Sequence, residues 1–165
     1  MQTTISAESI YIHIPFCKTK CPYCDFASWA KKEYLIDKYF DALLLEIKTK
    51  CEAYNAFHVW VDCNQPIQTI FIGGGTPSLI PPEYYEKLFN ELKKYFEIHK
   101  DCEITIELNP GTARDDFLEG YKRLGINRIS IGAQSFNEKI LETLGRKHSV
   151  DETIEAIEKI KKQDL

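Results

Sequence analysis

The chain has 165 residues, of which 44% are hydrophobic and 28% are charged. This is the composition of one soluble globular domain with an ordinary core, and it excludes a disordered or fibrous chain. The formal net charge of −4 leaves no basic footprint, so we expect neither nucleic acid nor an anionic membrane surface as a partner.

We expect no targeting signal in the first residues of the sequence. Residues 1–9 (MQTTISAES) lack both a basic start and an apolar core, and no later apolar run approaches the roughly 18 residues of a membrane span. We therefore expect a cytoplasmic protein without an integral membrane segment. Three of the six cysteines lie within one short motif, which favours a metal site in a reducing compartment over a disulfide framework.

Hydrophobic periodicity divides the chain into alternating strands and helices. Ser9–Phe16 alternates as a strand does, and Lys32–Tyr54 repeats apolar residues at helical spacing. The further elements are strands at Thr69–Ile72, Glu103–Leu108 and Arg128–Ile131, and helices at Pro81–Ile98, Ala113–Leu124, Asn137–Leu144 and Asp151–Lys162. We expect an irregular connection between Ala56 and Pro66.

This order of elements predicts an α/β fold with parallel strands and right-handed crossovers. Such a chain forms either an open doubly wound sheet or part of a barrel. The helix at Asp151–Lys162 is followed by no strand, which leaves a parallel strand edge uncovered. A closed eight-stranded barrel usually needs about 250 residues. We therefore expect the sequence to be incomplete, with about four βα units.

The segment CKTKCPYC places Cys17, Cys21 and Cys24 in the loop directly after the first strand. Iron-sulfur clusters are normally held by four cysteine thiolates, so three leave one iron of a 4Fe-4S cluster without a protein ligand. In radical chemistry S-adenosylmethionine binds that iron, which places its sulfonium for one-electron reductive cleavage. The alternative is a structural zinc ion with His13 or a distant cysteine as fourth ligand, although paired CxxC motifs or paired histidines are missing.

His13 and the three cysteines outside the motif have simpler interpretations. We expect His13 to be a strand residue with a satisfied polar tip, because alternation places it there. Cys51, Cys63 and Cys102 have no second cysteine at ligand spacing, so we interpret them as ordinary thiols.

Residues that follow the other strands test the metal-site interpretation, because α/β enzymes gather their sites at the carboxyl ends of parallel strands. Gly73–Pro77 (GGGTP) lets the backbone approach a ligand but has no phosphate-binding motif. Glu107 either binds the ammonium or ribose hydroxyls of a cofactor or pairs with Arg128 as a structural carboxylate. Gln134 and Arg146 follow the fourth strand; each by itself is an ordinary polar loop residue, but together the strand ends favour one site.

Four segments in this order resemble the coproporphyrinogen III oxidase-like branch of the radical S-adenosylmethionine superfamily. They are YIHIPFCKTKCPYC, GGGTPS, ITIELNP and RISIGAQSF. The resemblance covers essentially the whole chain. It implies that residues 1–165 are the N-terminal part of a radical S-adenosylmethionine core domain, a partial (β/α) barrel whose remaining units and C-terminal domain lie outside the sequence.

The resemblance also implies which residues bind the two cofactors. The implied ligands of the cluster are Cys17, Cys21 and Cys24. The implied contacts with S-adenosylmethionine come from Tyr11, Gly74 and Glu107. Four further residues match positions that the oxidase uses for a second S-adenosylmethionine: Gly75, Thr76, Gln134 and Arg146.

The sequence departs from the oxidase next to the third cysteine. The oxidase pattern is CxxxCxxCxC, whereas this chain has Phe26 in place of the last cysteine and resembles the heme chaperone subgroup, whose members are thought to bind heme and pass it on. This resemblance implies heme or porphyrin as cargo, heme-acceptor proteins, and a reductant such as flavodoxin or ferredoxin, with the heme-binding residues beyond Leu165. The alternatives are an oxygen-independent coproporphyrinogen III oxidase, which decarboxylates its substrate, and a zinc-stabilised α/β module.

Overall fold

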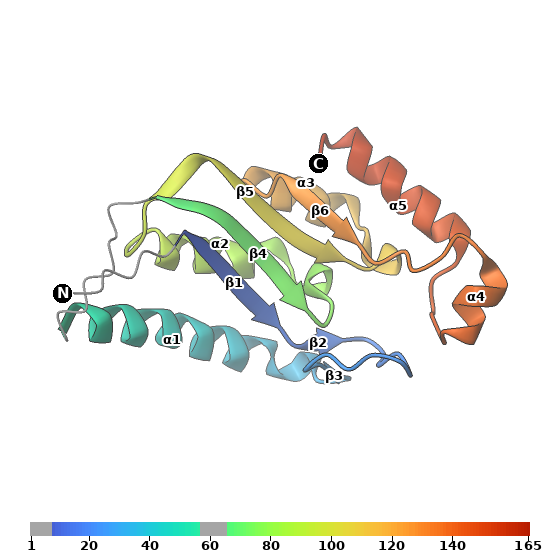
Figure 1. Ribbon diagram of the computed structural model, residues 1–165, viewed down its shortest axis with the longest axis horizontal. Coiled ribbons are helices and arrows are strands. Elements are labelled where there is room, and N and C mark those ends of the chain that lie inside the picture. The colour runs from blue at the N-terminus through green and yellow to red at the C-terminus, as the bar shows by residue number, and fades with distance from the viewer. Residues whose placement is uncertain (1–7, 57–65) are drawn as a thin grey trace, which may run out of the picture.

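The computed structural model describes residues 8–56 and 66–165 (Figure 1). Its strands are β1 (Ser9–Ile14), β2 (Phe16–Cys17), β3 (Trp29–Ala30), β4 (Ile67–Gly74), β5 (Ile98–Leu108) and β6 (Arg128–Ile131). Its α-helices are α1 (Ile36–Ala56), α2 (Pro82–Leu92), α3 (Asp115–Arg123), α4 (Glu138–Thr143) and α5 (Val150–Lys162). Short 3-10 helices lie at Glu33–Leu35, Pro77–Leu79 and Pro110–Thr112. Cys63 and most of the predicted connection at 56–66 lie outside the described residues, as does the start of the chain.

Four strands form one parallel sheet in the order β1-β4-β5-β6, so each successive βα unit adds its strand beside the previous one. This confirms the parallel strands predicted from the alternation of elements. Helix α1 packs against α2, and α2 packs against α3, which makes one helical layer. Figure 1 shows α2 and α3 behind the sheet, with α1 along its β1 edge. Within the described residues no helix is long and apolar enough to cross a membrane.

The ladder register decides which side chains meet the helices. Ile12 pairs with Ile72, Ile72 with Ile106, and Ile106 with Ile129, so one row of isoleucines crosses the whole sheet. Ile12, Ile72 and Ile106 are buried, and aromatic and aliphatic side chains from the helices complete the core. These helix residues include Phe40, Tyr85, Leu88, Phe89, Leu118 and Tyr121. Burying this apolar surface is the main term that holds the layers together.

Alternate strand residues face away from the helices. His13 pairs with Gly73, and Glu107 pairs with Ser130, which makes a polar row parallel to the isoleucine row. In a (β/α) barrel the face opposite the helices is the interior. The register therefore turns His13 and Glu107 toward the side on which a barrel would hold its ligand.

Several boundaries differ from the sequence prediction, most of all the end of α2 and the start of β5. The second helix ends at Leu92 rather than near Ile98, and β5 begins at Ile98 rather than Glu103. Phe96 continues the apolar spacing of the helix, but it reaches the core from a turn in which its N–H bonds the Leu92 carbonyl at 2.9 Å. Apolar periodicity indicates which residues are buried but not which backbone structure buries them. Here Phe96 packs against the core from a turn instead of a helix.

A contact between α2 and α3 depends on Gly120. A Cβ at this position would lie 2.4 Å from Cγ of Pro82, the first residue of α2, and the proline ring cannot rotate away. We expect Gly120→Ala to lower the free energy of unfolding of the full-length protein by about 1–3 kcal/mol through overpacking. Urea unfolding measures the change. Gly111→Ala is the control, because its nearest neighbours would lie 3.8 Å away, and it should change the stability by less than about 0.5 kcal/mol.

Candidate functional site

The three clustered cysteines lie on a loop that is closed at its base by a small parallel ladder. Phe16 pairs with Trp29 and Cys17 pairs with Ala30, so β2 and β3 bring the two ends of the loop together. Cys17 is buried on this ladder, whereas Cys21 and Cys24 are half-buried further along the loop. The ladder has only two residues in each strand, which is too short for a periodic sequence pattern, and it was not predicted.

Lys20 stabilises the conformation of the cysteine loop through hydrogen bonds within it. Its Nζ donates hydrogen bonds to the Phe26 carbonyl at 2.6 Å and to Oγ of Ser28 at 2.9 Å. A second bond closes a turn between two of the cysteines, because Cys24 N–H donates to the Cys21 carbonyl at 3.0 Å. Hydrogen bonds to a charged donor are stronger than neutral ones. The loop is therefore ordered by polar contacts instead of a hydrophobic core of its own.

The glycine turn after β4 packs directly against the base of the cysteine loop. Gly75 N–H donates to the Ile14 carbonyl and Thr76 N–H to the Phe16 carbonyl, each at 2.8 Å. A Cβ at Gly75 would lie 2.7 Å from the Phe16 oxygen and 3.0 Å from Sγ of Cys17. Thr76 Oγ1 lies 3.6 Å from the same sulfur. Glycine is required here because two backbones and a thiol meet with no room for a side chain.

Glu107 reaches the same turn from β5. Its Oε2 accepts a hydrogen bond from the Gly74 N–H at 2.9 Å, and Gly74 has a φ of +120°, a conformation that favours glycine. The proposed structural pairing of Glu107 with Arg128 is wrong, because Nη1 of Arg128 lies 3.4 Å from the carboxylate of Glu103 instead. The carboxylate of Glu107 is thus held by a backbone N–H at the glycine turn.

Arg146 connects the cysteine loop to the end of β6. Its Nη2 donates to the Gly132 carbonyl at 2.9 Å, and its Nη1 lies 3.5 Å from Sγ of Cys21 and 3.4 Å from the Tyr23 hydroxyl. The Nε of Arg146 is buried without a hydrogen-bond partner, which is a cost of about 1–3 kcal/mol. Burial, the largest effect, raises the pKa of Tyr23, and the neighbouring guanidinium opposes that shift.

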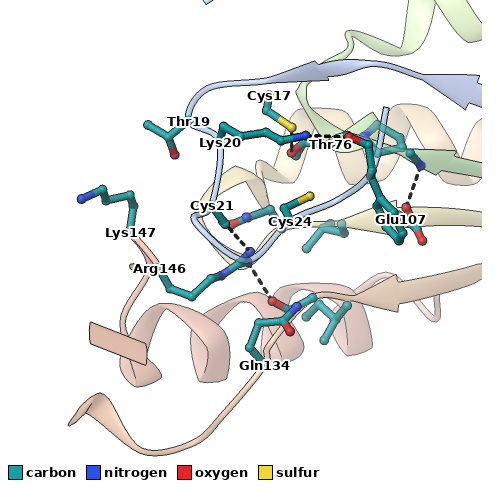
Figure 2. Close-up of a pocket in the computed structure, with 18 of the residues that line it drawn as sticks. Cys17, Thr19, Lys20, Cys21, Cys24, Thr76, Glu107, Gln134, Arg146 and Lys147 are labelled. Carbon is teal, nitrogen blue, oxygen red and sulfur yellow. Dashed lines mark hydrogen bonds between the residues drawn. The ribbon is translucent and has the colours of Figure 1, made fainter. Parts of the chain in front are cut away.

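These elements enclose a cavity of about 330 Å³ at the carboxyl ends of the four strands (Figure 2). It brings together nine of the ten residues that the sequence resemblance implied: Cys17, Cys21, Cys24, Gly74, Gly75, Thr76, Glu107, Gln134 and Arg146. Gln134 is exposed and has a φ of +61°, which is uncommon for a residue other than glycine. The strand ends that the sequence suggested do meet at one place.

Tyr11 is the residue that does not line this cavity. Its side chain is 59% exposed on the open face of the sheet, where its hydroxyl donates to Nδ1 of His13 at 3.1 Å. His13 Nε2 donates in turn to the Ala27 carbonyl of the cysteine loop at 2.7 Å. Burial and, secondarily, the charge of Glu107 raise the pKa of Tyr11, so the hydroxyl keeps its proton.

Sequence reasoning missed several wall residues. Lys20 and Tyr23 lie between the cysteines and were passed over as spacers, although their place in the motif was a usable signal. Ser130 is the register partner of Glu107, and only strand pairing puts it on the wall. Lys147 follows Arg146 at the rim.

Within residues 8–56 and 66–165, the zinc alternative finds no fourth ligand near the loop. Both ring nitrogens of His13 are engaged, by Tyr11 and by the Ala27 carbonyl. Cys51 lies toward the end of α1 and Cys102 is buried in the middle of β5, and both are away from the ends of these elements that lie near the cysteine loop. Among the residues that the structure describes, no three histidine, cysteine, aspartate or glutamate side chains are grouped as a single metal ion would require.

The donor set suits an iron-sulfur cluster that keeps one open iron. Three thiols face one cavity, and two further hydrogen-bond donors, Thr76 Oγ1 and Arg146 Nη1, lie beside the sulfurs of Cys17 and Cys21. Hydrogen bonds to cluster sulfurs and thiolates are one of the means by which proteins adjust cluster potentials. Because Gly74 and Gly75 have no side chains, they leave space on the same wall of the cavity for a second ligand.

Comparison with known proteins agrees with this arrangement. A model of the radical SAM superfamily matches residues 11–165. The heme chaperone HemW of Escherichia coli (strain K12) is 45% identical over 145 residues, which cover 87% of this chain and 36% of that protein. The heme chaperone HemW of Buchnera aphidicola subsp. Schizaphis graminum is 42% identical over 155 residues, covering 93% of this chain and 39% of the relative. The chain thus spans about two fifths of the length of these relatives.

A solved structure shows the same fold. The coproporphyrinogen III oxidase HemN from Escherichia coli, a radical SAM enzyme, superimposes with a TM-score of 0.81 and 24% identity, covering 98% of this chain and 35% of that one. This confirms the predicted partial barrel of radical SAM type with parallel strands.

The close approach of Gly75 to Cys17 yields a test of the site. Gly75→Ala would place a methyl group 3.0 Å from Sγ of Cys17, so we expect the thiol to be displaced and iron incorporation into the full-length protein to fall severalfold. Iron and sulfide content after anaerobic reconstitution measures this. Gly111→Ala, which has room for its methyl group, should incorporate iron as the unmodified protein does. Full incorporation by Gly75→Ala would show that the contact is dispensable.

Proposed function

The chain belongs to the radical SAM superfamily, and from this premise we propose that Cys17, Cys21 and Cys24 hold a 4Fe-4S cluster beside a binding site for S-adenosylmethionine. Membership of this family implies both cofactors. The observation that carries the assignment is that the three thiols line one cavity together with the glycine turn and Glu107. When bound, the two cofactors supply one-electron reductive cleavage of the sulfonium.

The residues of the chain have separate tasks in this site. The Glu107 carboxylate, kept in place by the Gly74 N–H, is the group that accepts hydrogen bonds from an ammonium or from ribose hydroxyls. Gly74 and Gly75 keep the wall free of side chains, so that backbone groups can reach the ligand. Tyr11 lies on the open face of the sheet, outside the cavity, and its hydroxyl contacts His13. Gln134, Thr76 and Arg146 border the same cavity.

The cluster assignment is tested by removing one thiol at a time. Cys17→Ala, Cys21→Ala and Cys24→Ala should each abolish the brown absorption of the reconstituted full-length protein, which should otherwise hold about four irons per cluster. Cys51→Ala and Cys102→Ala are matched controls, because both lie away from the loop, and they should leave the spectrum unchanged. Zinc in place of iron after anaerobic reconstitution would refute the assignment.

For the full-length protein we propose the function of a heme chaperone, which binds heme and transfers it to acceptor proteins. The support is the similarity to proteins named heme chaperone, at 42–45% identity for the two relatives above. The second support is Phe26, which stands where the oxidase pattern has a further cysteine. Its side chain is 60% exposed and lines the cavity, so a thiol at this position would face the cofactors. Phenylalanine can neither bind iron nor transfer a proton there.

The proposed partners follow from this function. Heme or another porphyrin is the cargo, and heme-binding proteins are the acceptors. The cluster needs an external one-electron donor, for which a small carrier such as flavodoxin or ferredoxin in the cytoplasm is suited.

A heme titration of the full-length protein, with an oxidase assay in parallel, distinguishes chaperone from oxidase. We expect stable heme binding and no conversion of coproporphyrinogen III, even with the cluster, S-adenosylmethionine and a reductant present. Phe26→Cys should not confer the oxidase reaction, since substrate recognition also depends on residues outside this chain. Optical spectra follow heme, and chromatography follows the porphyrinogens.

Efficient formation of protoporphyrinogen by the unmodified protein would replace the chaperone assignment with that of an oxidase. The same preparation provides the control for cofactor loading, because both assays are run on protein of known iron content.

A further inference from the structure

A buried histidine lies directly behind Arg146. His148 is 5% exposed, on the segment between α4 and α5, and it belongs to none of the motifs that pointed to the site. Its Nδ1 lies 3.2 Å from Nη2 of Arg146, and its Nε2 lies 3.1 Å from the Ala133 carbonyl oxygen. The imidazole therefore stands between the guanidinium and the backbone that follows β6.

The two partners of His148 determine its hydrogen-bonding state. A guanidinium can only donate and a carbonyl can only accept, so Nδ1 accepts from Arg146 while Nε2–H donates to Ala133. The ring is neutral in this arrangement. Burial, the largest effect, lowers the pKa of His148; the bond to Ala133 opposes this shift, and the charge of Arg146 adds to it.

The backbone around His148 is held by the helices on both sides. Ser149 forms a capping box with Glu152 at the start of α5, and the Val150 N–H donates to the Glu138 carboxylate of α4 at 2.7 Å. Arg146 N–H bonds the carbonyl of Leu141, a buried residue of α4, at 2.9 Å. The imidazole is thus presented to Arg146 from a rigid support.

The hydrogen bonds of the Arg146 guanidinium do not by themselves explain its orientation. Its Nε is buried without an acceptor, whereas Nη1 points toward Sγ of Cys21 and Nη2 is shared by Gly132 and His148. Figure 2 shows Arg146 reaching from the lower part of the site to the cysteine loop. An orientation that leaves one donor unsatisfied needs neighbours that impose it.

We propose that His148 is a positioning residue for Arg146, whose Nη1–H it directs at the sulfur of Cys21. This inference rests on the proposed function, since it makes the Arg146 hydrogen bond one that a cluster-ligating thiolate receives. A donor to such a thiolate stabilises the more negative, reduced cluster and raises its reduction potential. In the protein without cluster, the same contact restrains the Cys21 thiol.

The test uses full-length protein and three single variants. His148→Leu removes the acceptor and should shift the cluster potential to lower values; it should also make Cys21 of the cluster-free protein react severalfold faster with iodoacetamide, as located by mass spectrometry. His148→Asn keeps an acceptor and should return both measurements toward those of the unmodified protein. His99→Leu is the matched control, because His99 lies at the opposite end of β5 from the site, and it should change neither measurement.

A double variant separates positioning from a purely structural role. With Arg146→Gln already present, adding His148→Asn or His148→Leu should cause no further shift in potential, because the residue through which His148 acts is gone. A further shift in that background, or equal behaviour of His148→Leu and His99→Leu, would overturn the inference. Failure of the unmodified protein to take up a cluster would refute the proposed function instead, while the alkylation rates would still test the contact between Arg146 and Cys21.

Discussion

The approach of the Gly75 backbone to the thiol of Cys17 is the constraint on which the rest of the site depends. Sγ of Cys17 and the Phe16 carbonyl come so near that no Cβ can stand at position 75. This contact joins two segments that are far apart in the sequence. The parallel pairing of β1 with β4 places them side by side at the carboxyl ends of the two strands. With the strand ends side by side, the cysteine loop, the glycine turn and the end of β5 face one cavity.

Three charged side chains in the site are held by uncharged hydrogen-bond partners. The carboxylate of Glu107 is held by a backbone N–H, and the ammonium of Lys20 by a carbonyl and a serine hydroxyl. The guanidinium of Arg146 is held by a carbonyl and an imidazole. None of these partners carries an opposite charge, so each of the three charged groups keeps an electrostatic effect on a ligand in the cavity. A site for a zwitterionic cofactor needs charges of both signs within reach.

Two histidines support the site in the same manner from opposite sides. His13 donates to the Ala27 carbonyl and accepts from Tyr11, while His148 donates to the Ala133 carbonyl and accepts from Arg146. In each case an imidazole connects a side chain in or beside the cavity to a backbone carbonyl. Cofactor proteins gain specificity from such outer contacts, because they orient the groups that touch the ligand. Phe26, by contrast, lines the cavity itself.

The sequence by itself determined the order of elements, the parallel sheet and the metal motif, because alternating isoleucines in β1 and clustered cysteines are local patterns. Resemblance added the residues of the cofactor site, nine of which the fold gathers around one cavity. Only tertiary structure decided that Arg128 pairs with Glu103 and leaves Glu107 to the site, that Tyr11 stands outside the cavity, and that His148 supports Arg146. Those facts depend on strand register and on contacts between distant segments, and a local pattern carries no information about either. The short β2–β3 ladder and the turn at Phe96 escaped prediction for the same reason, since their residues are ordered by what packs against them.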